Sequence, residues 1–244
     1  TNERYNKRII INKLKTKKMS ENKSTVKDTI EKIVKKDFGI YFFTLDTKGN
    51  PTAGVATIYE HVKILRELGF NAQILHDKND YKLRGDEEGM GIAEWLGEEY
   101  AELPHISIES QTLKVGPQDF VIIPEAFASI MKQTVNFPCK RIVFLQSYEY
   151  IFEMLEIGEN WSAFGINEVI TTNENLKKYA ESIFRNLVTE VIPIGIPNYF
   201  KNSDKPKIPT IAISARDKRE ILKIVKVFFQ KYPHYRFITF RDMS

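Results

Sequence analysis

The chain has 244 residues, of which 42% are hydrophobic and 28% charged, a composition typical of a globular protein. Its single cysteine, Cys139, excludes an internal disulfide and a cysteine-based metal cluster and favours a reducing compartment. No apolar run approaches the roughly 20 residues that a membrane-spanning helix needs, and the first residues lack the apolar core of a signal peptide. Because Cys139 follows Phe137-Pro138 at the start of a probable strand, we expect it to be a packing residue rather than a nucleophile.

Basic residues are concentrated at the start of the chain, although the net charge is only +4. Residues 1–36 contain twelve Lys and Arg against four Asp and Glu, which leaves 24 against 28 for the other residues. We therefore expect no nucleic acid partner for the folded body. An apolar stripe at helical spacing is formed by Val26, Ile30, Ile33 and Val34. Residues 1–37 are thus expected to be a basic leader that ends in a short amphipathic helix.

Two roles are open for that amphipathic helix. It would either dock on its own domain or contact an anionic membrane surface through residues 24–36. The second role would place a cytoplasmic protein at the inner face of the membrane. In either case we expect a cytoplasmic location.

The stretch that follows the leader predicts a strand, a loop and a helix. Residues 39–45 form a continuous apolar run, as in a strand buried on both faces of a parallel sheet. Residues 46–54 are rich in turn formers, and from Val55 to Leu68 apolar residues recur every three or four positions. Gly69 marks the expected helix end, and the next strand is predicted at 71–75.

The loop before that helix contains Gly49 and Gly54, which have the spacing of the glycines in a P-loop. Val55-Ala56 stand where a P-loop needs Lys and then Ser or Thr, and G-x-G-x-x-G is also absent. The loop can still offer backbone N–H groups and the positive end of the helix dipole to a ligand. Alternatively, Gly54 only permits a tight turn between strand and helix.

The alternation of strands and helices continues to about residue 197. Apolar runs predict further strands at 106–108, 119–124, 141–145, 168–172 and 190–193, and helices are expected at 92–101, 126–132 and 176–184. This order predicts an α/β fold with a Rossmann-like parallel sheet and helices on both faces. Ligands of such sheets bind at the carboxyl ends of the strands. On that rim we expect Gly49, Asn50, Thr52, Gly54, Glu125, Gln146, Ser147, Glu149 and Asn173.

A domain boundary is predicted at residues 198–209, a polar, Pro-containing linker. Residues 210–244 then restart the pattern, with strands at 210–214 and 236–240 around a helix at 220–231. A lone βαβ unit cannot enclose a core, so we expect the start of an incomplete second Rossmann-like domain. The apolar residues that such a unit would expose predict self-association or a longer polypeptide; they include Val225, Phe228 and Phe237.

Four segments, taken in order, resemble the retaining GT-B-fold glycosyltransferases of the family-four type. They are the glycine-loop helix at 54–70, the strand-to-helix segment at 169–177, the hinge at 191–197, and the strand with a basic turn at 211–219. The resemblance implies an acceptor-side N-terminal domain at 38–197 and the start of a donor-binding domain at 210–244. It also implies a hexosyltransferase that moves a sugar from a nucleotide sugar to a glycan or other acceptor, as in cell-surface polysaccharide biosynthesis.

In this resemblance, Arg216 and either Lys218 or Arg219 would contact the donor diphosphate, and Gly54 would let its loop approach the substrates. Neither a metal nor a cofactor is implied. Two departures stand out: Gln146 and the residues after it replace a His of many relatives, and Ile194-Gly195 replace Asn-Gly. The family's paired glutamates have no counterpart before Ser244, so we expect this chain alone to be inactive, and its catalytic residues are not identified.

A second reading is a non-catalytic α/β binding or assembly module that kept the acceptor-side domain. The four histidines do not favour another enzyme class, because their spacing is not that of metal ligands; they are His61, His76, His105 and His234. We expect His61 to be a surface or hydrogen-bonded histidine rather than a base. The G-x-S-x-G motif of many hydrolases is absent from the sequence.

Overall fold

The computed structural model describes residues 38–82, 91–195, 208–213 and 218–239. The chain divides into two compact units, Thr1–Ile194 and Gly195–Ser244, and each is described by itself. The predicted leader at 1–37 lies outside the described residues, as do Arg216 and all of the predicted linker except its last two residues.

The first unit is built on a seven-stranded sheet in the order β3-β2-β1-β4-β5-β6-β7. Its strands are β1 (Gly39–Phe43), β2 (Asn71–His76), β3 (His105–Ser107), β4 (Phe120–Pro124), β5 (Lys140–Leu145), β6 (Glu168–Thr171) and β7 (Val188–Val191). Every neighbouring pair is parallel. The predicted parallel α/β sheet is therefore confirmed, and the apolar runs at 39–45 and 119–124 contain its adjacent interior strands β1 and β4.

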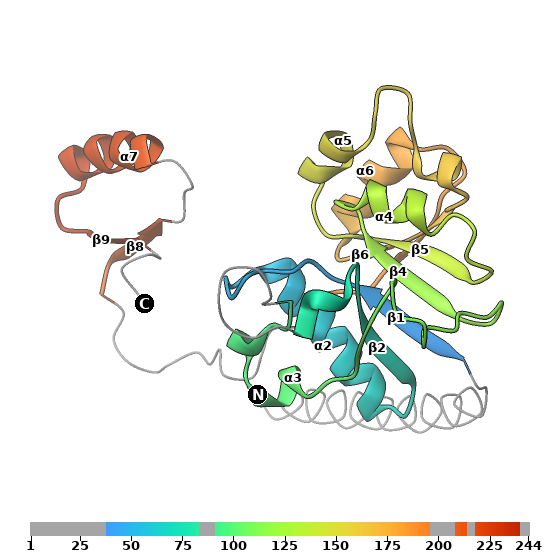
Figure 1. The fold of residues 1–244 in the computed structure, drawn as a ribbon. Helices are drawn as coiled ribbons and strands as arrows, with labels where there is room; N and C mark the ends of the chain where they lie inside the picture. The colour runs from blue at the N-terminus through green and yellow to red at the C-terminus, as the bar shows by residue number, and fades with distance from the viewer. Residues whose placement is uncertain (1–37, 83–90, 196–207, 214–217, 240–244) are drawn as a thin grey trace, which may run out of the picture. The chain divides into compact units, whose positions relative to one another are not determined.

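Helices cover both faces of this sheet (Figure 1). They are α2 (Ala53–Glu67), α3 (Glu98–Ala101), α4 (Ala128–Gln133), α5 (Glu149–Met154) and α6 (Glu174–Ile183), with short 3-10 helices η1 (Asn79–Lys82), η2 (Glu94–Leu96) and η3 (Trp161–Phe164). One core joins α4, α5, η3 and α6 to side chains such as Val121 and Val143. The other core joins α2 to Phe42 and Ile122 on the opposite face. Because successive strand residues point to opposite faces, burial on both sides requires the continuous apolar runs.

Several element boundaries differ from the predicted ones. The stretch 92–101, predicted as one helix, forms η2 and α3, because Gly97 between them has a φ of 113°, outside helical space. The strand predicted at 190–193 is instead β7, Val188–Val191. The last hydrogen bond of its pairing is donated by the Ile192 N–H to the Thr171 carbonyl. The pairing cannot continue to Pro193, because proline has no N–H.

The second unit is a parallel βαβ unit, with β8 (Thr210–Ile213), α7 (Lys218–Lys231) and β9 (Arg236–Thr239). Phe228 of α7 packs its ring against Phe237 of β9 and against Tyr235, both at 5.7 Å between centroids. The predicted exposure of Val225, Phe228 and Phe237 is wrong, because all three are half-buried in this unit. The exposed apolar side chains of α7 are instead Leu222, Ile224, Val227 and Phe229. The predicted strand, helix and strand are thus present in this unit.

Candidate functional site at the carboxyl ends of the strands

The strand order reverses direction between β1 and β4, which are neighbours in the interior of the sheet. The chain leaves β1 toward β2 on one side, whereas it leaves β4 toward β5 on the other side. The connections therefore diverge at the carboxyl ends of β1 and β4. In open α/β sheets this point forms the crevice in which ligands bind. We call the strand ends and loops around it the rim, comprising residues 44–54, 125 and 146–149.

The loop after β1 is shaped by its own hydrogen bonds. The Asn50 N–H donates to the Thr47 carbonyl at 2.9 Å, and the Asn50 side-chain amide donates to the same carbonyl at 3.2 Å. The Thr52 hydroxyl donates to the Asn50 carbonyl, and Trp95 Nε1–H donates to Thr47 Oγ1 at 3.1 Å. Gly49 adopts a φ of 78° in this turn, which glycine does without strain. The predicted rim residues Gly49, Asn50 and Thr52 thus have a structural role in holding the loop.

Gly54 lies in the first turn of α2 and faces the side chain of Gln146. A Cβ built on Gly54 would lie 3.5 Å from the Gln146 amide atoms, which is ordinary contact distance. The backbone of Gly54 does not have a positive φ, so its conformation does not require glycine. The Thr52 side chain also makes no capping hydrogen bond to α2. The structure therefore brings Gly54 and Gln146 together, with the Gln146 amide beside the positive end of the helix.

Glu125, directly after β4, is the most unusual group of the rim. Its side chain is only 2% exposed, and Oε1 accepts a hydrogen bond from the Ser147 N–H at 2.7 Å. The other oxygen, Oε2, is buried and has no hydrogen-bond partner among the described residues. Burial raises the pKa of Glu125 above its usual 4.5, and N–H groups including that of Ser147 offset part of the effect. A buried carboxyl oxygen without a partner is costly unless a ligand or water completes its hydrogen bonding.

The remaining predicted residues of the first unit are less closely tied to Glu125. Glu149 is exposed in the first turn of α5, and its N–H donates to Ser147 Oγ at 3.3 Å. Asn173 is the N-cap of α6, where Oδ1 accepts a hydrogen bond from the Leu176 N–H at 2.9 Å. This cap explains why α6 begins at Glu174, two residues before the predicted start. The structure thus groups Gly54, Glu125, Gln146 and Ser147, and gives Asn173 a capping role.

Sequence reasoning missed a buried histidine pair, because its members lie on different strands. His76 Nε2 and His105 Nδ1 are 2.8 Å apart, and the Tyr81 ring stacks on His76 with centroids at 4.3 Å. Burial lowers the pKa of His105 to about 4, and burial together with His105 lowers the pKa of His76 to about 3. Both imidazoles are therefore neutral near pH 7, so one nitrogen of the pair donates and the other accepts. The only advance signal was that each histidine adjoins an apolar strand.

The other histidine and metal predictions can be compared with the structure only in the described segments. His61 Nδ1 lies 2.7 Å from the Thr57 carbonyl, so His61 is hydrogen-bonded within α2, as predicted. In those segments no three His, Cys, Asp or Glu side chains are grouped closely enough to hold a metal ion. Cys139 packs against the core, and burial raises its pKa, in agreement with the predicted packing role.

The predicted donor-binding residues belong to the second unit. Lys218 begins α7, and Arg219 is exposed in the first turn of that helix.

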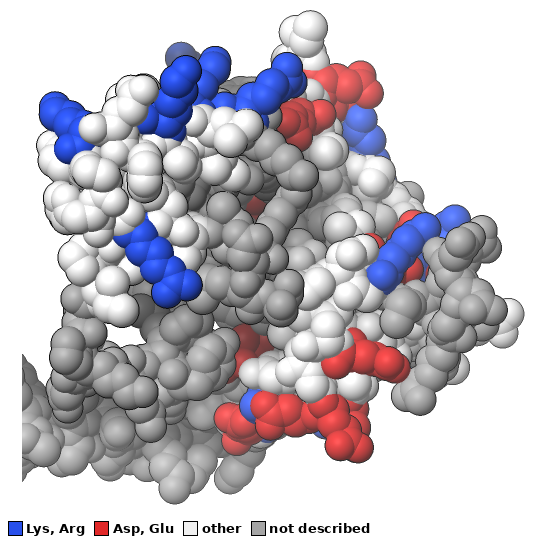
Figure 2. All heavy atoms as spheres, turned by 90° about the vertical axis from the view of Figure 1, so that its left-hand side faces the viewer, with Lys and Arg blue, Asp and Glu red and all other residues white. Residues whose placement is uncertain are grey.

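On the face shown in Figure 2, Lys and Arg side chains stand among uncharged ones, and the largest group of Asp and Glu side chains lies in the lower part of the view. Among the described residues, the structure contains no helix with the length and apolarity needed to span a membrane.

The chain is 26% identical over 216 residues to a protein named alpha-1,6-glucosyltransferase from Actinobacillus pleuropneumoniae serotype 7 (strain AP76). The alignment covers 85% of this chain but only 60% of that protein, so the chain spans less than two thirds of the relative's length. No protein-family model matches the chain.

Proposed function

We propose that this chain is the acceptor-side part of a glycosyltransferase that moves a hexose from a nucleotide sugar to a hydroxyl of a glycan. The observation that carries the proposal is the buried Glu125 carboxyl at the crevice between β1 and β4, with Oε2 unpartnered among the described residues. The similarity to a protein named alpha-1,6-glucosyltransferase favours glucosyl transfer. The GT-B architecture of the family-four type belongs to the same proposal.

Glu125 and Gln146 have the chemistry that a saccharide requires. A sugar hydroxyl both donates and accepts hydrogen bonds. A desolvated carboxylate oxygen is a strong acceptor of the hydrogen bond that the hydroxyl donates. The Gln146 amide can donate to one hydroxyl and accept from the next. In the transfer, the acceptor oxygen bonds to the anomeric carbon as the bond from that carbon to the diphosphate breaks. The electron pair leaves with the nucleoside diphosphate, and the acceptor proton passes to that leaving group or to a base.

Glu125 is proposed to bind and orient the acceptor rather than to take its proton. Orientation alone can supply a large part of a rate enhancement, because the reacting oxygen is held at the correct distance. The donor diphosphate would be bound by the second unit, through Arg216 with Lys218 or Arg219. Cations there would stabilise the negative charge that develops on the leaving group.

The chain by itself is proposed to transfer no sugar, since it matches only 60% of its relative's length. The test therefore uses a longer polypeptide that contains this chain, with UDP-glucose as donor and an α-1,6-linked glucose oligomer as acceptor. We expect transfer by the longer polypeptide and no transfer above background by the 244-residue chain.

The variants Glu125→Ala and Glu125→Gln should lower kcat/KM by about 100-fold, as expected when a desolvated, transition-state-orienting contact is lost. The matched control is Glu153→Gln, an exposed glutamate of α5, which should retain full activity. Unchanged activity in Glu125→Gln would show that the site is wrongly placed. If the longer polypeptide bound saccharides without transferring any sugar, the non-catalytic binding module would be the better reading.

A further inference from the structure

Two exposed tyrosines extend the rim beyond Glu125. Tyr148 follows Ser147 in the chain and is 51% exposed, and Tyr179 on α6 is 37% exposed. Their rings are 5.4 Å apart between centroids and meet at 69°, edge to face. The pair comes from two neighbouring connections, since Tyr148 follows β5 and Tyr179 follows β6.

The position of Tyr148 is coupled to Glu125 through the backbone. Glu125 Oε1 accepts a hydrogen bond from the Ser147 N–H, and Tyr148 is the next residue and the N-cap of α5. The buried carboxyl that would bind an acceptor hydroxyl therefore also anchors the segment that carries the aromatic ring. Tyr148 therefore adjoins the backbone group that is hydrogen-bonded to Glu125, and Tyr179 contacts Tyr148.

The chemistry of the tyrosines fits a sugar ring. A tyrosine offers an apolar face together with a hydroxyl at its tip, and an edge-to-face pair leaves ring surface open to solvent. A pyranose likewise has a face of C–H groups surrounded by hydroxyls. Stacking the two buries apolar surface while the hydroxyls of both remain hydrogen-bonded.

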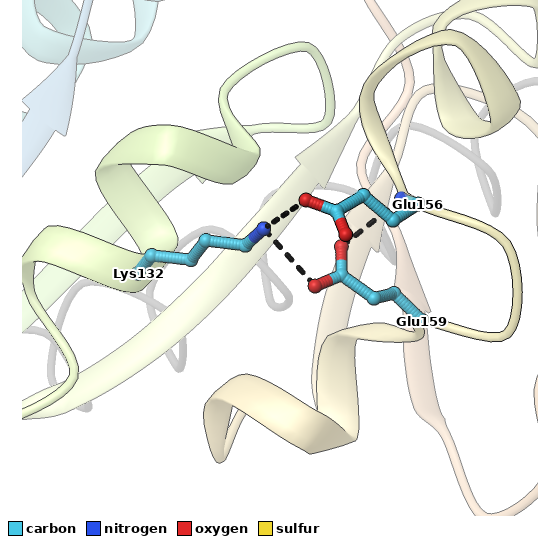
Figure 3. Close-up of polar contacts among 3 residues, drawn as sticks. All are labelled: Lys132, Glu156 and Glu159. Atoms are coloured by element: carbon cyan, nitrogen blue, oxygen red, sulfur yellow. Dashed lines mark hydrogen bonds and ion pairs between the residues drawn. The ribbon is translucent and has the colours of Figure 1, made fainter.

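The charge around Tyr148 selects among possible ligands. Residues 149–159 contain four glutamates and no lysine or arginine; they are Glu149, Glu153, Glu156 and Glu159. Figure 3 shows the Lys132 side chain directed at Glu156 and Glu159, with Nζ–oxygen distances of 3.3 and 3.0 Å. This ion pairing ties the loop after α5 to α4. The positive charge of Lys132 is thus already paired with Glu156 and Glu159. On the Tyr179 side, Lys177 pairs with Glu181 at 3.9 Å and Lys178 is exposed, so the acidic character belongs to the Tyr148 side of the pair. An anionic glycan or an anionic lipid surface would be repelled on that side by Glu149 and Glu153.

We propose that Tyr148 and Tyr179 form a second saccharide subsite beside Glu125, so that the acceptor is an uncharged oligosaccharide of at least two sugars. This inference rests on the proposed function of the rim. It predicts that affinity increases with acceptor length, because the first sugar contacts Glu125 and the next one stacks on the tyrosines.

The test measures binding of glucose and of α-1,6-linked glucose di- and trisaccharides to the 244-residue chain by isothermal titration calorimetry or NMR titration. We expect about tenfold tighter binding of the trisaccharide than of glucose. The variants Tyr148→Ala and Tyr179→Ala should remove this difference, whereas Tyr148→Phe should keep it. The control Phe229→Ala removes another aromatic side chain that is 51% exposed, on α7, and should leave the length dependence unchanged.

The outcomes separate the subsite from the function on which it rests. Glu125→Gln should weaken binding of all three saccharides equally; if it does not, the rim itself is wrong. Binding that does not depend on length, or a length dependence that survives Tyr148→Ala, would overturn the tyrosine subsite alone. Absence of any saccharide binding would overturn both. Binding to phosphatidylglycerol vesicles that is lost in Tyr148→Ala would replace the sugar by a membrane contact.

Discussion

Glu125 is the residue at which the proposed function and stability are most clearly opposed. Its buried carboxyl has a pKa above 4.5, and Oε2 has no partner among the described residues. Above pH 4.5 the unfolded chain ionises this group more readily than the folded chain does, so Glu125 lowers stability at neutral pH. Groups of this kind persist where a ligand uses them, since binding can compensate for the cost.

Glu125→Gln should therefore raise the free energy of unfolding by about 1 kcal/mol at pH 7, because it removes a buried charge but keeps the acceptor for the Ser147 N–H. The gain should shrink as the pH falls through the raised folded-state pKa toward 4.5, and it should be absent well below 4.5, where the wild-type carboxyl is protonated in both states. Urea unfolding followed by tryptophan fluorescence measures it, since both tryptophans, Trp95 and Trp161, lie in the first unit. A variant less stable than wild type at pH 7 would contradict this account.

The buried pair His76 and His105 gives the first unit a second, opposite pH response. Their folded-state pKa values, about 3 and about 4, lie below the 6.5 of an unfolded histidine. As the pH falls below 6.5, the unfolded chain binds protons that the folded chain excludes, so stability is lost. The loss is complete only below the folded-state pKa values.

Each histidine that stays neutral in the folded chain at pH 5 should lower the free energy of unfolding by about 2 kcal/mol compared with pH 7.5. Replacing both by glutamine should flatten the dependence of the unfolding free energy on pH between 6.5 and 4, whatever its effect on absolute stability. His234→Gln, at an exposed position, serves as the control and should keep the wild-type slope. If the double variant kept that slope as well, the pair would not be the source of the pH response.

At the level of secondary structure, α2 and α6, which each follow a strand of the sheet, begin differently. The first N–H groups of α6 are capped by the side chain of Asn173, whereas Thr52 gives α2 no such hydrogen bond. An uncapped helix start can donate to a ligand, while a capped one has already satisfied an N–H group. This difference favours α2, beside Gly54, over α6 as the helix that approaches the substrate.

Asn173→Ala should lower the free energy of unfolding by about 1 kcal/mol, the usual contribution of an N-cap. Asn173→Asp keeps an oxygen acceptor for the Leu176 N–H and should retain most of that stability. The same two proteins test the predicted acceptor-side role of Asn173. If Asn173→Asp remained stable but bound α-1,6-linked glucose oligomers more weakly, Asn173 would contact the acceptor as well as cap α6.

For the whole chain, the first and second units differ in how they are built. The first unit encloses a core on each face of its sheet, which includes fully buried Trp161 and Tyr59. In the described part of the second unit there are two strands and one helix, and Phe228 of that helix contacts Tyr232 at 4.7 Å between ring centroids as well as Tyr235 and Phe237. A unit this small depends strongly on each buried aromatic contact.

Phe228→Ala should cost about 2–4 kcal/mol locally, enough to remove most amide-exchange protection between residues 210 and 239. Protection at 39–191 should not change, because Phe228 belongs to the other compact unit. Hydrogen exchange with mass spectrometry on the 244-residue chain measures both regions at once. Phe229→Ala, at an exposed position, should have a smaller effect; equal loss of protection in both units would indicate that they fold together.

Local patterns in the sequence were sufficient to predict the fold class. Continuous apolar runs that alternate with three-to-four-residue periodicity indicated a parallel sheet with helices on both faces, and the structure confirms this arrangement. These signals are local because strand and helix preferences depend on residues a few positions apart. The same argument placed Glu125 and Gln146 after strands, and therefore at one edge of the sheet.

Tertiary structure alone decided which strands are neighbours and what each side chain contacts. Asp119 accepts a hydrogen bond from the Gly39 N–H across 80 residues of sequence, and His76 meets His105 across 29. The burial of Glu125, its bond to Ser147 and the approach of Gln146 to Gly54 likewise follow from the order of β1, β4 and β5. Such contacts cannot be read from spacing, because they depend on how distant segments pack together and exclude water.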